Sequence, residues 1–169
     1  DQPFLDEPPR YQLLQAIRLA TTGGDNQFVD AAAALRLLAH LDAPAAHLLR
    51  TVPVRFHRRQ AAFERIVDSP IFVDGPDGVR VRYSYFTMAP HRRPFAEMEA
   101  WYRAYDRFAR LVRDPANQLR ARLLPGGSAT FSGRANGRVA VVLEGVRTDA
   151  SQASGDLALL RGKDVLLVF

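Results

Sequence analysis

The sequence predicts a mainly β fold with helical insertions, in which the strands pair antiparallel. Two observations lead to this fold class. Short apolar runs separated by Gly-rich turns recur at roughly ten-residue spacing in the last third of the chain, as in a sandwich or barrel. Other stretches show helical periodicity. With 169 residues, 47% of them hydrophobic, the chain has the size and composition of one domain with a hydrophobic core.

The first two strands are expected to flank a glycine-containing turn. Residues 10–20 mix alternation with a continuous apolar run, which suits a strand of a two-sheet core. Residues 22–26 predict a turn, because Gly tolerates positive φ and because Asp and Asn side chains bond their own backbone. A short strand over residues 27–29 returns from this turn.

Two helices are expected next. Asp30 is placed to cap a helix over residues 31–41, a stretch rich in Ala and Leu with leucines at helical spacing. Asp42, with Pro44 in the following first turn, begins a second and shorter helix that ends near residue 50.

The middle of the chain predicts strands and one clear hairpin. Residues 52–57 alternate apolar and polar side chains, as a half-buried strand does. Residues 66–73 and 79–85 flank the turn at 74–78, whose sequence Asp-Gly-Pro-Asp-Gly is typical of a hairpin. One face of the second arm carries Val and Tyr. The opposite face, which includes Arg82, either meets solvent or lines a pocket.

The strongest helix is expected to begin at Pro94 and to end near residue 113, before Pro115. A stripe of mostly aromatic side chains at three- to four-residue spacing predicts the face that covers one sheet, while charged side chains face away. We interpret this stripe as core rather than as part of a cofactor site. It consists of Phe95, Met98, Tyr102, Tyr105, Ala109 and Val112.

The remaining chain predicts short strands. A turn is expected at Pro125-Gly126-Gly127, because Pro and Gly are the strongest turn residues. The expected strands cover residues 119–124, 129–131, 139–143 and 165–169.

Composition excludes several classes of site. The chain has no cysteine, which excludes disulfides, Cys-ligated metals and thiol nucleophiles, so a metal would need His, Asp or Glu. No apolar run of about 18 residues and no signal-peptide pattern occurs, so we expect no membrane partner and a cytoplasmic location. The net charge of +5 comes almost wholly from arginines spread from Arg10 to Arg161. This spread favours a solvated surface, and nucleic-acid binding is the minor alternative.

The common nucleotide and acyl-transfer motifs do not occur. The sequence lacks G-x-G-x-x-G after a strand, a P-loop and a G-x-S-x-G turn. The four histidines, His40, His47, His57 and His91, have no partner at metal-ligand spacing. From the residues alone, the sequence offers no complete catalytic set.

Several motifs nevertheless follow one another in a recognisable order over residues 1–125. The chain opens on Asp1-Gln2-Pro3-Phe4 and continues with Pro8-Pro9-Arg10-Tyr11-Gln12-Leu13-Leu14 and Gly23-Gly24-Asp25-Asn26-Gln27-Phe28-Val29-Asp30. The stretches 79–85, 101–105 and 122–126 follow. This order resembles the γ-butyrobetaine and trimethyllysine dioxygenases, TauD-type Fe(II)/2-oxoglutarate-dependent oxygenases. Their motifs are H-T-D-x-P, P-P-x-x-Q-L-L and G-G-D-S-x-x-V-D.

The resemblance implies an iron centre held by two His and one carboxylate, which leaves positions open for 2-oxoglutarate and O2. Asp1 matches the Asp of H-x-D, whose His would stand two residues earlier, so we expect native residues upstream of Asp1. In H-x-D the two side chains point to the same side of a strand and reach one metal ion. Asn136 stands where the family places the distal His, although Asn is a poor iron ligand.

The resemblance also implies cofactor-binding and substrate-binding residues. Asn26 occupies the position where relatives carry Ser or Thr near the 2-oxo acid, and a simple turn role is equally favoured. Arg147 is the candidate for the Arg that pairs with the 2-oxoglutarate carboxylate. Tyr83 and Tyr85 are candidates for the substrate pocket, with packing in the core as the alternative.

The fold implied by the resemblance is a double-stranded β-helix, or jelly roll. We expect one incomplete domain over residues 1–169, which diverges from the family over residues 127–169. The implied function is hydroxylation of a small substrate such as a trimethylammonium carboxylate, as in carnitine biosynthesis. It would require Fe(II), 2-oxoglutarate and O2, with ascorbate as reductant, and relatives imply a homodimer. The alternative is a catalytically inactive jelly roll or fragment with a binding role.

Overall fold

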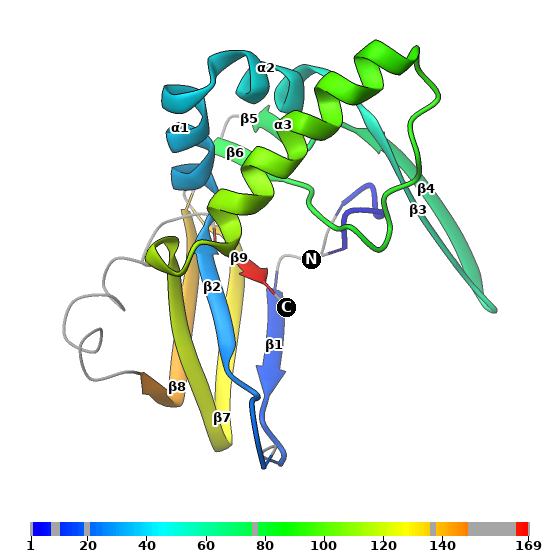
Figure 1. Cartoon of the computed structure of the whole chain (residues 1–169). Helices are drawn as coiled ribbons and strands as arrows, with labels where there is room; N and C mark the ends of the chain where they lie inside the picture. Colours follow the sequence, from blue (N-terminus) through cyan, green and yellow to red (C-terminus); the bar gives the residue numbers. More distant parts are fainter. Residues whose placement is uncertain are drawn as a thin grey trace.

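One antiparallel sheet, two β-hairpins and a group of helices at one end of the sheet make up the fold (Figure 1). The structure is a computed structural model. It describes residues 2–7, 11–18, 21–75, 78–135, 138–148 and 165–168. The expected mixture of strands with inserted helices is confirmed for this part of the chain.

The five-stranded sheet is built around its longest strand, β7 (Gln118–Ala135). β8 (Arg138–Thr148) pairs with one edge of β7, and β1 (Tyr11–Gln15) and β2 (Asn26–Asp30) share the other. β1 pairs with residues 128–132 of β7 and β2 with residues 118–121, and Figure 1 shows β1 running away from the helices and β2 running toward them. β9 (Val165–Val168) pairs with β2 and completes the sheet. The strands expected at 27–29 and near 165–169 are confirmed, and the strand expected over residues 10–20 covers only Tyr11–Gln15.

β7 is continuous through Pro125-Gly126-Gly127, where we expected a turn between two strands. Figure 1 shows that β7 folds back on itself at the end of the sheet farthest from the helices, so the chain reverses its direction within this strand. The pairing of β7 with β8 changes register between Leu123 and Ser128. Pro and Gly suit such irregular backbone. The expected change of direction is therefore present, but the ladder does not end on either side of it.

The expected hairpin is confirmed, but its arms are shorter than predicted. β5 (Phe72–Gly75) pairs with β6 (Gly78–Val81), and Gly78 has a φ of 108°. Residues 63–69, which we assigned partly to this hairpin, belong to β4 (Phe63–Ser69). β4 pairs with β3 (Val54–Gln60) in a second hairpin that projects from the body of the molecule (Figure 1).

Aspartate caps begin the first two helices, as predicted. Asp30 Oδ1 accepts a hydrogen bond from the Ala33 amide at 2.8 Å, and α1 (Ala31–Leu41) follows. Asp42 Oδ1 accepts one from the Ala45 amide at 3.1 Å at the start of α2 (Ala43–Thr51). The Asp42 carboxylate also forms an ion pair with Arg107, which ties α2 to the next helix.

The longest helix, α3 (Phe95–Arg113), has the predicted limits, and the predicted stripe is buried at Tyr105, Ala109 and Val112. A 3₁₀ turn, η1 (Pro115–Asn117), follows it. Trp101, Phe108 and Val112 are fully buried, whereas Phe95 is 75% exposed and Tyr102 is 39% exposed. The expected stripe is therefore wrong at these two positions. Aromatic residues occur on two faces of α3, so periodicity left the choice of face open.

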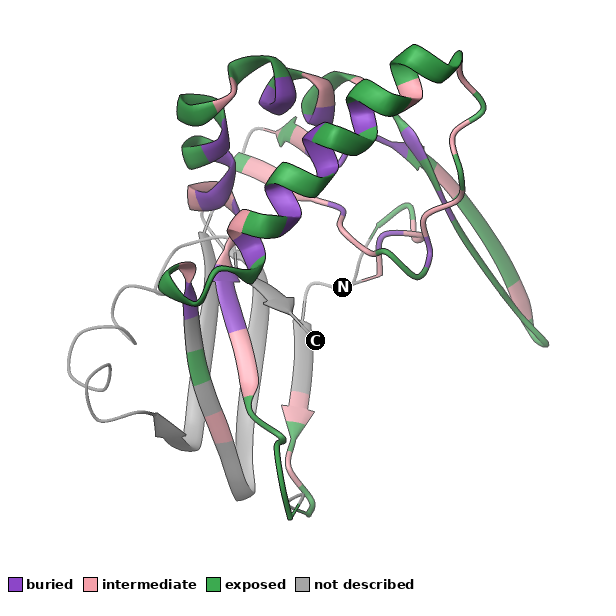
Figure 2. Cartoon of the chain, in the orientation of Figure 1, coloured by how far each residue is buried: buried purple, intermediate pink, exposed green. Residues whose placement is uncertain are grey.

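The core lies where the three helices meet β5 and the base of β3 (Figure 2). Phe72 and Phe108 pack edge to face with ring centroids 4.9 Å apart. Phe28 of β2 is also fully buried. Among the described residues, no helix has both the length and the apolar character required to cross a membrane.

Candidate functional site

The N-terminal segment, defined as residues 2–7, is held by the side chain of Arg82. Arg82 Nη1 donates hydrogen bonds to the carbonyl oxygens of Pro3 at 2.7 Å and Leu5 at 2.6 Å. Arg82 Nη2 donates one to the carbonyl oxygen of Asp6 at 2.8 Å. The guanidinium therefore binds three backbone carbonyls of the segment that follows Asp1.

The position of Arg82 is itself fixed by the core. Its backbone amide donates to the carbonyl oxygen of Ile71 at 2.7 Å, and Ile71 is fully buried. Arg82 is only 9% exposed, and this burial lowers the pKa of its guanidinium below the ordinary value. The side chain still carries its charge near neutral pH, because an arginine in a protein is not deprotonated there.

The charge of Arg82 is compensated by carbonyl dipoles and, over a longer distance, by the carboxylates of Glu7 and Asp6. No carboxylate among the described residues lies within ion-pair distance of its guanidinium. Buried charges require hydrogen-bond partners, and the planar guanidinium offers several donors in fixed directions. Our expectation that the Arg-bearing face meets solvent or lines a pocket is wrong for Arg82, since β6 ends at Val81 and the side chain turns to the N-terminal segment.

Two further contacts hold the N-terminal segment. The Phe4 ring stacks on the Phe63 ring of β4, with centroids 6.3 Å apart and planes inclined by 19°. Glu7 Oε1 lies 3.9 Å from Arg80 Nη1, in an exposed ion pair. The segment therefore lies between the projecting hairpin and the chain that leaves β6.

The two residues predicted to bind the cofactor lie on neighbouring strands. Asn26 begins β2 and is paired with Ala121 of β7. The next residue of β7, Arg122, is paired through the backbone with Arg147 of β8. Arg122 Nε lies 3.9 Å from Asp25 Oδ1, which links β7 to the turn before β2. Asn26 and Arg147, which are far apart in the sequence, thus pair with consecutive residues of β7. Their role in cofactor binding stays a prediction.

The two tyrosines predicted for the substrate pocket have different surroundings. Tyr83 packs against the core, with its ring 5.2 Å from that of Tyr105 and 5.4 Å from that of Phe108. Tyr85 is 71% exposed and contacts the Phe86 ring at 5.9 Å. The structure does not bring the two rings together. Their part in substrate binding stays a prediction.

The described residues contain no group of three His, Asp or Glu side chains that could hold a metal ion. His40 and His47 are exposed on α1 and α2, and His57 Nε2 lies 2.7 Å from Glu64 Oε1 on the projecting hairpin. The two residues that the resemblance assigns to iron, Asp1 and Asn136, lie outside the described residues. The described side chains therefore do not form an iron site by themselves, and we derive no reaction step through a metal.

The fourth histidine belongs to an aromatic cluster at α3. The His91 ring lies 4.3 Å from the Trp101 ring and 5.5 Å from the Tyr102 ring. Its Nε2 is buried without a hydrogen-bond partner in the described part of the chain. Burial, reinforced by the nearby positive charge of Arg93, lowers the pKa of His91, so its neutral form is favoured.

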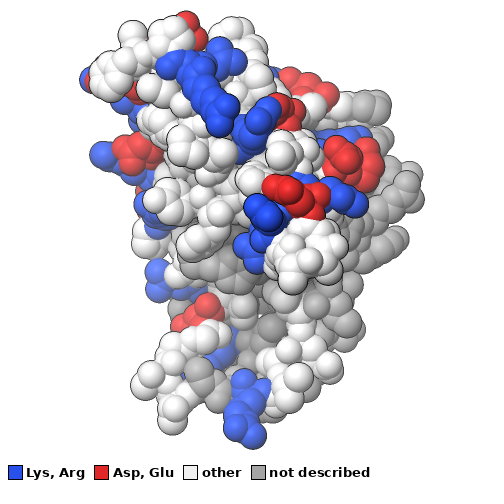
Figure 3. Space-filling model, turned by 90° about the vertical axis from the view of Figure 1, so that its right-hand side faces the viewer, with Lys and Arg blue, Asp and Glu red and all other residues white. Residues whose placement is uncertain are grey.

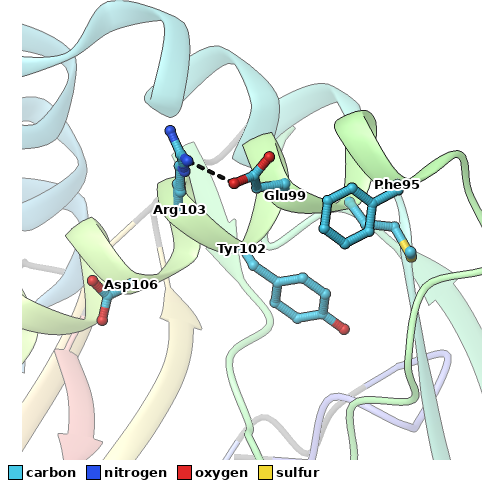
Figure 4. Close-up of a pocket in the computed structure, with 6 residues that line it drawn as sticks. Phe95, Glu99, Tyr102, Arg103 and Asp106 are labelled. Atoms are coloured by element: carbon cyan, nitrogen blue, oxygen red, sulfur yellow. Dashed lines mark hydrogen bonds and ion pairs between the residues drawn. The ribbon is translucent and has the colours of Figure 1, made fainter.

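A shallow groove follows the exposed face of α3 (Figure 4). Tyr102 and Arg103 project to different sides of the helix, and Arg103 Nη2 lies 2.6 Å from Glu99 Oε1. The groove presents aromatic surface beside charged side chains, and none of the predicted site residues lines it. Its lining residues are Phe95, Met98, Glu99, Tyr102, Arg103 and Asp106.

Basic side chains on the face shown in Figure 3 are spread over its length, with acidic side chains among them. Several arginines in the described part of the chain form ion pairs with exposed partners. Arg55 Nη2 lies 2.7 Å from Asp68 Oδ2, and Arg50 Nη1 lies 2.8 Å from Asp74 Oδ2. This arrangement agrees with the solvated surface expected from the dispersed arginines.

Comparisons with known proteins relate this chain to dioxygenases. The family model described as "Taurine catabolism dioxygenase TauD, TfdA family" matches residues 1–135. The chain is 31% identical to gamma-butyrobetaine dioxygenase from Pseudomonas sp. (strain AK-1) over 137 residues, which cover 79% of the chain and 36% of that protein. It is 27% identical to trimethyllysine dioxygenase from Meyerozyma guilliermondii over 139 residues, which cover 78% of the chain and 35% of that protein. The chain thus spans about a third of the length of these relatives.

Proposed function

Because the chain belongs to the TauD/TfdA dioxygenase family, we propose that it forms part of the catalytic domain of a 2-oxoglutarate-dependent dioxygenase, an oxidoreductase. The observation that carries the proposal is the family match over residues 1–135, which includes every motif on which the resemblance rests. The divergence expected over residues 127–169 stays a prediction.

The antiparallel sheet supports the proposal. In a jelly roll, antiparallel strands pack as two sheets around a site. Here β2, β7 and β8 are neighbouring antiparallel strands of one sheet. We propose that this sheet is one wall of a double-stranded β-helix.

The cofactors follow from the family. TauD-family dioxygenases generally use Fe(II) and 2-oxoglutarate, which together activate O2 for oxidation of a C–H bond. We propose Asp1 as an iron ligand, Asn136 as the position of the distal ligand, and Asn26 and Arg147 as partners of 2-oxoglutarate. The contribution that the described residues make is to hold the segment after Asp1 and the β2–β7–β8 ladder in place.

We propose a small substrate that carries a trimethylammonium group and a carboxylate. The printed names of two relatives refer to such compounds, γ-butyrobetaine and trimethyllysine. A quaternary ammonium group binds well to aromatic rings, which attract cations through their π electrons. Tyr83 and Tyr85 remain our candidates for this contact. A homodimer, a cytoplasmic location and the lack of nucleic-acid and membrane partners stay predictions.

The test is an assay of the complete encoded protein with Fe(II), ascorbate, O2 and 2-oxoglutarate. Succinate formation should rise when γ-butyrobetaine or trimethyllysine is added, and γ-aminobutyrate, which lacks the methyl groups, should give a much smaller rise. Asp1→Asn should abolish the reaction, because it removes a carboxylate ligand. Glu99→Gln, a change on the exposed face of α3, should leave it intact.

Two outcomes would contradict the proposal. Succinate formation that does not depend on any trimethylammonium compound would contradict the substrate class. The lack of both succinate formation and 2-oxoglutarate binding would contradict the enzymatic function and favour an inactive jelly roll with a binding role.

A further inference from the structure

We infer that Arg82 is a positioning residue that fixes the N-terminal segment and, through it, the residue that carries the metal-binding carboxylate, Asp1. The role toward the metal rests on the proposed function. The role toward the segment rests on the structure alone. The two parts are separated in the test below.

Arg82 is held by the core at its backbone and binds the N-terminal segment with its side chain. Its backbone amide is bonded to the buried Ile71, so the side chain starts from the rigid core. Its guanidinium then reaches three carbonyl oxygens, those of Pro3, Leu5 and Asp6, at 2.6 to 2.8 Å. Three short bonds from one planar group determine both the position and the orientation of the segment.

The segment has a compact backbone for Arg82 to bind. The Leu5 amide donates to the Gln2 carbonyl oxygen at 3.1 Å, which closes a turn over residues 2–5. Pro3 is buried, and proline restricts the backbone of this turn further.

An arginine is required by this arrangement of acceptors. Lysine has a single ammonium group at the end of a flexible stem, and it cannot meet three carbonyls in these directions. A neutral side chain of similar length would leave buried carbonyl oxygens without donors. The lack of a carboxylate partner among the described residues means that the donors of Arg82 are directed to the segment and not to an ion pair.

The other contacts of the segment are weaker. The stacked pair of Phe4 and Phe63 restrains one ring but no backbone atom. The ion pair of Glu7 with Arg80 is exposed, and its atoms are 3.9 Å apart. Exposed ion pairs contribute little to stability. Arg82 is therefore the main restraint on the backbone of residues 2–7.

The test compares Arg82→Met and Arg82→Lys with the matched control Arg80→Met. Arg80 lies two positions earlier in the chain, but its side chain is 42% exposed and binds the segment only through the long ion pair. Hydrogen exchange of the Leu5 amide should become at least about tenfold faster in both Arg82 variants. It should stay within about twofold of the unsubstituted protein in Arg80→Met. Fluorescence of Trp101, the only tryptophan, reports whether the core remains folded.

The second readout is the affinity for Mn(II), which takes the place of Fe(II) without oxidation. The dissociation constant should rise by about tenfold or more in the Arg82 variants, as for residues that orient metal ligands, and stay unchanged in Arg80→Met. Faster exchange with unchanged Mn(II) affinity would overturn the role toward the metal. Unchanged exchange of the Leu5 amide in a folded Arg82 variant would overturn the inference as a whole.

Failure of the proposed function would give a different experimental result from failure of the inference about Arg82. If the unsubstituted protein binds no Mn(II), the proposed function and the metal role both fail, and the exchange data still decide whether Arg82 fixes the segment. If Arg82→Met does not fold, the comparison rests on Arg82→Lys, which keeps the positive charge and loses only the forked set of donors.

Discussion

A single buried guanidinium decides where the start of this chain lies. Arg82 belongs to a stretch whose alternation predicted one apolar face and one Arg-bearing face that meets solvent or lines a pocket, and neither alternative describes its buried side chain. Burial of an arginine becomes favourable only when its donors are satisfied, and here the acceptors are backbone carbonyls. Backbone acceptors have no sequence signature, so the contact could not be predicted from residue types.

Local side-chain chemistry, by contrast, was predictable. Asp30 and Asp42 were assigned as helix caps, and both accept the expected amide hydrogen bonds. An N-cap depends on a residue and the three that follow it, so a short stretch of sequence contains the necessary information. The iron, cofactor and substrate residues came from the resemblance, and they stay predictions.

His91 should make the stability of the protein depend on pH. Burial, with Arg93 nearby, lowers the pKa of His91 in the folded state below its value near 6.5 in the unfolded chain. The unfolded state then binds more protons as the pH falls below 6.5. The free energy of unfolding should decrease with falling pH until the folded pKa is reached, with a slope of at most about 1.4 kcal/mol per pH unit.

Urea unfolding at pH 7.5, 6.5 and 5.5 measures this effect. The free energy of unfolding of His91→Gln should lack the pH dependence that comes from His91. The variant should therefore become more stable relative to the unsubstituted protein as the pH falls. His47→Gln, a change on the exposed side of α2, is the control and should keep the original dependence. The same dependence in both variants would contradict the role of His91.

At the scale of the elements, the sequence predicted helices better than strand pairing. The limits of α1, α2 and α3 agree with the capping and proline signals. The hairpin of β3 and β4 was missed, because its connection at Ala61 and Ala62 has none of the usual turn residues. The reversal of the chain near Pro125-Gly126-Gly127 was expected, but the continuation of the β7 ladder through it was not, because Pro and Gly usually end a strand.

The buried face of α3 can be tested with two phenylalanines of the same helix. Phe108 is fully buried against Phe72 and Tyr83, so Phe108→Ala should reduce the free energy of unfolding by about 3–5 kcal/mol. Phe95 is 75% exposed, so Phe95→Ala should change it by less than about 0.5 kcal/mol. Denaturant titration of both variants measures the difference. A similar loss of unfolding free energy in the two variants would show that Phe95 is packed in the core, as predicted from the sequence.

At the scale of the whole molecule, the predicted class of fold is confirmed only in outline. A strand-rich chain with inserted helices was expected and observed. The pairing of β9 with β2, and the shared edge of β7 with β1 and β2, join residues far apart in the sequence. Such pairings depend on the packing of the complete chain, and a single sequence contains no local signal for them. The family resemblance supplied what the residues alone did not.

The contacts of Arg82 have a consequence for the order of folding. They connect residues 76 to 79 positions apart, whereas β5 and β6 pair across a tight turn. Contacts that close a long loop cost more chain entropy, so we expect the N-terminal segment to dock after the transition state has formed. Arg82→Met should then accelerate unfolding and leave the folding rate almost unchanged, as measured by stopped-flow kinetics over a range of urea concentrations.

A slower folding rate in this variant would place the contact in the folding nucleus instead. With late docking, the first residues of the chain reach their position only on a body that has already folded. The segment that carries the predicted metal-binding motif would then be the last part to assemble and the first to detach, and a partly folded molecule would lack its site.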